Sequence, residues 1–151
     1  MEFCGIGPDG AEHLALMLMF IKSALEELRL GGNNLGNEGV KRLFAGAKMA
    51  KKLKTLDVSN NKFNIEQITG ELASLITTNT LLGTYDLSSN VVTDEGVTHL
   101  VNSLLTSGAD GCGHLKSIVL PVNASEAAQT ALKAAYTKKA GKKVGNKKKK
   151  K

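Results

Sequence analysis

The sequence predicts an α/β fold in which short strand–turn–helix units repeat along the chain and stack side by side. Three observations lead to this prediction. Copies of one leucine-rich segment begin at Leu25, Leu53, Leu82 and Leu115, spaced by 28, 29 and 33 residues. An asparagine recurs at the same place in each copy. Within a copy, the spacing of apolar residues changes from every second residue to a helical period.

The first part of each copy has the pattern of a short strand. Leu28 and Leu30 alternate with Glu27 and Arg29, so the two leucines face one side and the charged residues the other. The second part has the pattern of an amphipathic helix. Its apolar stripe is formed by Val40, Leu43, Phe44 and Ala47 in the first copy, and by Val97, Leu100, Val101 and Leu104 in the third.

One such unit cannot bury its own apolar side, whereas a stack of units buries all of them. We therefore expect a short solenoid of stacked units, with parallel strands along one edge and helices along the other. The domain is expected to span residues 1–137. The apolar run His13 to Ile21 is too short for a membrane span and is interpreted as a buried helix face.

The recurring asparagines are Asn33, Asn61, Asn90 and Asn123. A sharp turn after each strand leaves backbone polar groups inside the stack, and these groups need partners. An asparagine side chain offers both a donor and an acceptor, so each is expected to bond the turn of its own coil and of the next coil. A ligand-binding role for these amides is the alternative.

The N-terminal residues fit the same frame one period earlier. The segment from Cys4 aligns with the segment from Asn33, so Cys4 takes the asparagine position of an incomplete first unit. Either Met1–Phe3 form a stub strand or the chain belongs to a longer solenoid. Cys4 is expected to be a buried structural thiol.

Two copies depart from the pattern. The second has no glycine turn before its helix and carries Gly70 within it, which predicts a helix that starts late or is loose. The third has an insertion at Ser107 to His114, whose glycines predict a mobile loop. Cys112 and His114 lie there, but two ligands do not make a metal site. The last copy has Pro121 after its strand and an alanine-rich helix, as expected of a closing repeat.

Charge is distributed unevenly along the chain. Residues 138–151 hold nine lysines and no acid, and the remainder has 11 lysines and arginines against 14 acids. The tail is expected to be disordered and to attract polyanions without reading bases. Its lysines are Lys138, Lys139, Lys142, Lys143, Lys147, Lys148, Lys149, Lys150 and Lys151. A solubility tail with no dedicated partner is the alternative.

Two cysteines do not form a disulfide framework, which favours an intracellular, cytoplasmic location, with a nuclear one as an alternative.

These copies resemble the leucine-rich repeat family, and within it the ribonuclease-inhibitor-like subclass. The pattern L-x-x-L-x-L-x-x-N-x-L is filled by Leu25, Leu28, Leu30, Asn33 and Leu35, and the match covers about residues 1–136. The same subclass resembles Ran GTPase-activating proteins, tropomodulins and CARMIL proteins. The resemblance implies a short right-handed α/β solenoid of about 4–5 repeats, with parallel strands on the concave side and α-helices on the convex side. It also implies a scaffold for protein binding.

In this register, the residues between the leucines face the concave side and form the candidate protein-binding face. They are Glu27, Arg29, Thr55, Asp57, Ser59, Thr84, Asp86, Ser88, Ser117 and Val119. A solvated face without a partner is the alternative.

The sequence favours a non-enzymatic interaction module, because it holds no catalytic constellation, phosphate-binding loop or metal cluster. No cofactor is expected. A protein partner would bind the concave face, and the basic tail would add affinity for an acidic surface. The first alternative is an adaptor on RNA or the ribosome, anchored by the tail. The second, a regulator of GTPases or of the actin or tubulin cytoskeleton, rests on fold analogy alone.

Overall fold

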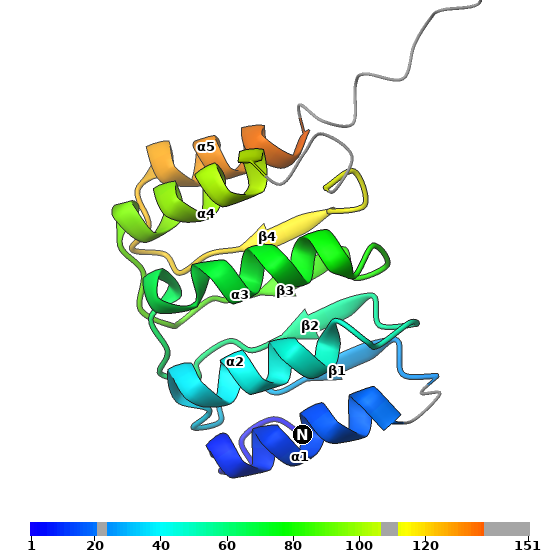
Figure 1. Ribbon diagram of the computed structural model, residues 1–151. Coiled ribbons are helices and arrows are strands. Elements are labelled where there is room, and N and C mark those ends of the chain that lie inside the picture. The colour runs from blue at the N-terminus through cyan, green and yellow to red at the C-terminus, as the bar shows by residue number, and fades with distance from the viewer. Residues whose placement is uncertain (21–23, 107–111, 138–151) are drawn as a thin grey trace, which may run out of the picture.

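The computed structural model describes residues 1–20, 24–106 and 112–137, which form a solenoid of alternating helices and strands. Figure 1 shows the coils stacked one above another, with the helices in one layer and the strands in a second layer behind it. The helices are α1 (Pro8–Phe20), α2 (Gly36–Ala47), α3 (Ile65–Thr78), α4 (Asp94–Thr106) and α5 (Glu126–Thr137), and the strands are β1 (Glu27–Arg29), β2 (Thr55–Asp57), β3 (Thr84–Asp86) and β4 (Ser117–Val119).

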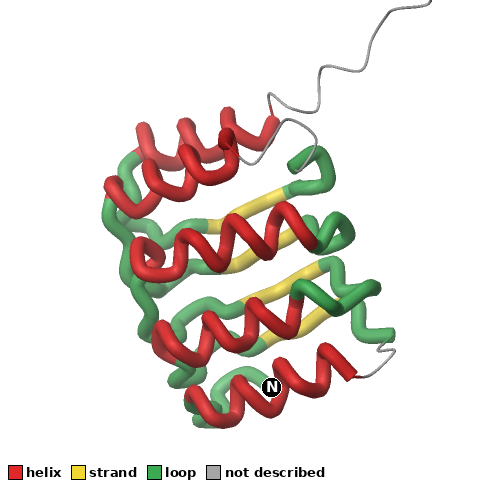
Figure 2. Tube along the Cα trace, in the orientation of Figure 1, coloured by secondary structure: helices red, strands yellow, loops and turns green. Residues whose placement is uncertain are grey.

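The four strands form one parallel sheet in chain order, β1-β2-β3-β4. Figure 2 shows these strands running side by side, each followed by a helix that returns across the other layer. The fold is thus the α/β solenoid that the sequence predicts. The core lies between the layers and is built mostly of leucine, isoleucine, valine and alanine, because the inward residue of each strand faces the apolar stripe of the helices.

The repeated asparagines Asn33, Asn61 and Asn90 are buried and bond backbone groups. Asn90 donates to the carbonyl oxygens of Val58, Leu87 and Ser88 at 3.0–3.1 Å and accepts from the amide of Asn61 at 2.8 Å. The bonds therefore join the asparagine's own turn to the preceding coil. The prediction that these side chains bond the next coil is wrong, because they bond the preceding coil instead.

Asn123 and Cys4, at the two ends of this series, do not follow the expected pattern. Asn123 is exposed and makes one long bond to the Val92 carbonyl at 3.4 Å, because the turn after Pro121 closes on itself and no coil covers it within the described residues. Cys4 is exposed as well. Its backbone amide donates to Asn33, whereas its thiol bonds the nearby Glu2 carbonyl.

Helix α3 begins at once after its strand turn, so the prediction of a late or loose helix is wrong. The reason is Asn64, whose side chain accepts a hydrogen bond from the amide of Glu66 and caps the helix. Gly70 faces open space within an otherwise regular helix of 14 residues.

The expected buried apolar face on α1 is only partly buried. Ala15 and Leu18 are buried, whereas Leu16 and Met19 are 44% and 48% exposed. Met1–Phe3 form no strand, although the Phe3 amide bonds the Gly31 carbonyl as a neighbouring coil would. Residues 107–111 of the insertion lie outside the described residues, as does the tail.

We expect removal of an internal amide to be costly, because it leaves several buried backbone groups without partners. Asn90→Ala should lower the free energy of unfolding by about 3 kcal/mol in urea titrations. Asn123→Ala is the matched control and should change it by less than about 0.5 kcal/mol, because Asn123 is exposed. Equal losses in the two variants would show that the buried bonds do not support the stack.

Tyr85 offers the opposite case, a buried polar group that the fold does not satisfy. Its hydroxyl has no hydrogen-bond partner among the described residues, and burial raises the pKa of Tyr85. The same strand position holds Leu56 in the preceding coil. Tyr85→Phe should therefore raise the free energy of unfolding by about 1 kcal/mol, measured by thermal and urea unfolding. A loss of stability would mean that the hydroxyl has a partner, such as bound water.

His114 should make stability depend on pH. Burial lowers the pKa of its imidazole below the usual value near 6.5, and the hydrogen bond to the Ile76 backbone offsets this only in part. Below that usual value, the unfolded chain takes up a proton more readily than the folded chain, so stability falls as the pH falls. Urea unfolding at pH 8 and pH 5.5 should show a larger loss for the parent than for His114→Gln. Parallel losses would contradict this assignment.

Candidate functional site: the concave strand face

The outward side chains of the four strands form two straight rows across the sheet. The parallel register places Glu27, Thr55, Thr84 and Ser117 in one row. Arg29, Asp57, Asp86 and Val119 form the other. Because successive side chains of a strand face opposite sides, these residues lie exposed or half-buried on the side opposite the helices. The structure thus brings eight of the ten predicted residues together in two rows, and the other two, Ser59 and Ser88, lie two residues beyond the ends of β2 and β3.

Asp57 and Asp86 occupy adjacent places in the second row and are held in the same way. One carboxylate oxygen of Asp57 accepts from the amide of Ser59 at 2.8 Å, and Asp86 accepts from the amide of Ser88 at 2.9 Å. These local bonds fix the carboxylates, because each one spans only two residues of backbone. Within the described residues, neither aspartate has a basic side chain as an ion-pair partner.

The nearest cation in the register, Arg29, is already engaged. Its guanidinium pairs with Glu27 on the same strand at 2.9 Å, and both side chains are more than half exposed. This pair leaves the β1 end of the face nearly neutral. The negative charge of the face is therefore concentrated on β2 and β3.

Close packing beside the face depends on Gly31. A methyl group at Gly31 would lie 2.8 Å from the Ser59 hydroxyl and about 3.4 Å from the Asp57 carboxylate. Glycine therefore leaves room for the Asp57–Ser59 turn to sit against the preceding coil.

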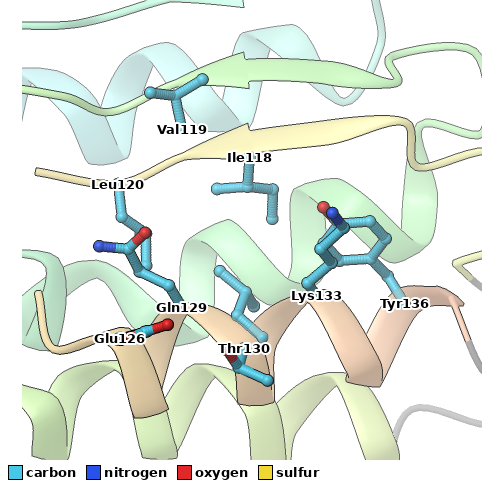
Figure 3. Close-up of a pocket in the computed structure, with 9 residues that line it drawn as sticks. Ile118, Val119, Leu120, Glu126, Gln129, Thr130, Lys133 and Tyr136 are labelled. Carbon is cyan, nitrogen blue, oxygen red and sulfur yellow. The ribbon is translucent and has the colours of Figure 1, made fainter.

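A pocket that the sequence analysis missed lies at the other end of the sheet, between β4 and α5. Figure 3 shows Ile118 and Leu120 pointing from β4 toward α5, with Val119 pointing away. The pocket has a volume of about 390 Å³, and Leu132 and Tyr136 add to its apolar wall. Its polar rim is Glu126, Gln129, Thr130 and Lys133. The sequence did hold a signal for this pocket, because these four polar residues are spaced to lie on one face of the helix. A helix face that is fully covered would carry apolar residues there.

The described residues offer little for catalysis or metal binding. No group of three or more histidine, cysteine, aspartate or glutamate side chains is placed to hold a metal ion in the described ranges. Cys112 is buried within the hydrophobic core, and His114 is half-buried. No helix in the described ranges is both long and apolar enough to cross a membrane.

Comparison with known proteins finds the same repeat. A family model described as Leucine Rich repeat matches residues 23–44 and 78–101, and another described as Leucine Rich Repeat matches residues 52–77. These ranges contain the strands β1, β2 and β3 and most of the helices α2, α3 and α4.

One relative is the mouse (Mus musculus) protein named NACHT, LRR and PYD domains-containing protein 14. It is 30% identical over an alignment of 121 residues, and the match covers 75% of this chain and 12% of the relative. This chain therefore spans a small part of that protein. Leucine-rich repeats build the solenoid described above, and its fold is that of the leucine-rich-repeat family.

Proposed function

We propose that this chain is a non-enzymatic interaction module that binds a protein partner through its concave strand face. Leucine-rich repeats are in general protein-interaction modules, which supports the broad class. The observation that carries the specific proposal is the pair of ordered carboxylates, Asp57 and Asp86, which lie side by side without a cation from the described residues.

The chemistry of the face defines its partner. Around the two carboxylates lie the hydroxyl groups of Thr55, Thr84 and Ser117, which both donate and accept hydrogen bonds. A lysine or arginine of the partner, placed between the aspartates, would make charge-assisted bonds to carboxylates that are already oriented. The partner surface is therefore basic and rich in hydrogen-bond donors.

The face contains no exposed aromatic anchor and only one arginine, which is paired within the chain. Interfaces usually draw most of their affinity from such anchors. The sheet also has only four short strands, so the contact area is small. We infer a weak, electrostatically steered contact, in which the partner supplies the large side chains.

We assign the repeats to the ribonuclease-inhibitor-like subclass. Its support is the spacing of 28 and 29 residues between the first three copies, together with full helices of 12 to 14 residues on the convex layer. The lysine-rich tail, residues 138–151, would add affinity for an acidic surface by charge alone.

The test neutralises and then reverses the two carboxylates. Asp57→Asn with Asp86→Asn keeps an acceptor for the amides of Ser59 and Ser88 while removing both charges, so the fold should persist. Captured partners should bind several-fold more weakly, as measured by quantitative pull-down from extract and then with purified components. Asp57→Lys with Asp86→Lys should abolish their binding, because like charges now face each other.

The matched control reverses two exposed acids away from the strands, Glu2→Lys with Glu95→Lys, and changes the net charge by the same amount. Its partner set should equal that of the parent. If the concave and control variants capture the same proteins with equal affinity, the concave face is not the binding site.

A further inference from the structure

The solenoid separates the charges of its loops onto two opposite edges. Figure 1 shows the helices running in one direction, so that all first turns lie along one edge and all last turns along the other. Every helix carries an acid in its first turn: Asp9, Glu38, Glu66, Asp94 with Glu95, and Glu126. At the helix C-terminal ends, the loops that lead to β2 and β4 carry lysines, and Glu26 lies just before β1.

The densest group lies in the loop from α2 to β2. Lys48, Lys51, Lys52 and Lys54 fall within seven residues. Lys54 pairs with Glu26 of the neighbouring coil at 2.7 Å, and its hydrogen bond and charge lower the pKa of that carboxyl, with a smaller effect from Lys52. Within the described residues, the other three lysines make no ion pair.

Hydrogen bonds from the next coil hold this loop in place. Asn79 is buried in the next coil and donates to the carbonyl oxygens of Ala47 and Ala50 at 2.8 and 3.0 Å. It also accepts from the amides of Leu81 and Leu82. The lysines therefore project from ordered backbone, and the positive charge has a fixed position on the solenoid.

The same edge continues across the start of the sheet. The Gly83 amide bonds the Lys54 carbonyl, and the Lys116 amide bonds the Gly83 carbonyl, so these residues are neighbours on successive coils. The aliphatic chain of Lys116 crosses directly over Gly83, because a methyl group there would lie 3.3 Å from its Cγ. The edge thus carries Lys54 before β2 and Lys116 before β4, with the uncharged Gly83 before β3 between them.

Three apolar side chains stand exposed at or just after the C-terminal ends of α2, α3 and α4. Met49, Leu81 and Leu105 are 50%, 56% and 49% exposed. Met49 lies between Lys48 and Lys51 in the same ordered loop. The edge therefore combines cations with protruding flexible apolar groups, whereas aromatic side chains are absent from its described loops.

We propose that this basic edge, defined by Lys48, Lys51, Lys52, Lys116 and the apolar Met49, Leu81 and Leu105, docks on an anionic lipid bilayer. The lysines meet the charged headgroups, and the apolar side chains enter the interface between them. A nucleic acid fits the edge less well, because single strands are held by stacking on aromatic rings and arginine planes. The concave face lies on a different side and stays free for a protein partner.

The test measures co-sedimentation of the full chain with vesicles of phosphatidylcholine containing about 30% phosphatidylserine. The variant Lys48→Gln, Lys51→Gln, Lys52→Gln should bind at least about tenfold more weakly than the parent. The control Lys41→Gln, Lys62→Gln, Lys133→Gln removes the same charge from other sides of the solenoid. It should lose much less affinity, even though both variants keep the lysine-rich tail. Equal losses would overturn the proposal.

The apolar part is tested separately by Met49→Ser, which leaves every charge in place. It should lower vesicle binding by about threefold, because the variant lacks the apolar side chain that the parent would bury in the bilayer interface. Binding to heparin should stay unchanged. Unchanged vesicle binding would overturn the bilayer assignment. So would an RNA affinity that exceeds vesicle affinity and falls with the three loop lysines. Melting temperatures of all variants establish that each is folded.

Discussion

The structure depends on one constraint, which is that the turn after each strand carries backbone polar groups into a dry interior. Buried amides and carbonyls are costly unless they are bonded. The side chains of Asn33, Asn61 and Asn90 supply these bonds, and each also forms hydrogen bonds with backbone groups of the preceding coil. These bonds fix how one coil sits on the last. They therefore also set the strand register, on which the straight rows of the concave face depend.

The sequence was sufficient for the repeat and for the face it presents. Leu56 and Val58 alternate with Thr55 and Asp57 and left one possible orientation for the strand, because a shift by one residue would turn the apolar side chains to water. The residues at the two ends of the repeat series were harder to predict. Cys4 and Asn123 hold the right place in the repeat, but burial there depends on a neighbouring coil that the repeat pattern alone does not supply. The start of α3 depended on Asn64, a local cap outside the repeat pattern.

Two surfaces were missed because they are not properties of single positions. The pocket beside α5 arises between two elements, and only the distance from β4 to the helix creates it. The basic edge was hidden by counting charge along the chain. The part of the chain before the tail has a net charge of −3, yet the acids of the first helical turns and the lysines of the loop from α2 to β2 lie on opposite edges. Asn79 was missed because it belongs to a helix end, where its bonds to Ala47 and Ala50 repeat nowhere else in the described residues.

A repeat of constant length makes such segregation nearly unavoidable. A residue type that recurs at one phase of the period is carried to the same side of the stack in every coil. Acids favoured at helix N-termini by the helix dipole therefore accumulate along one edge, as Glu38 and Glu66 do. Lys48, Lys51 and Lys52, which follow the end of α2, lie along the other. The result is a charge dipole parallel to the strands, which would turn the basic edge toward an anionic surface and leave the concave face open to the side.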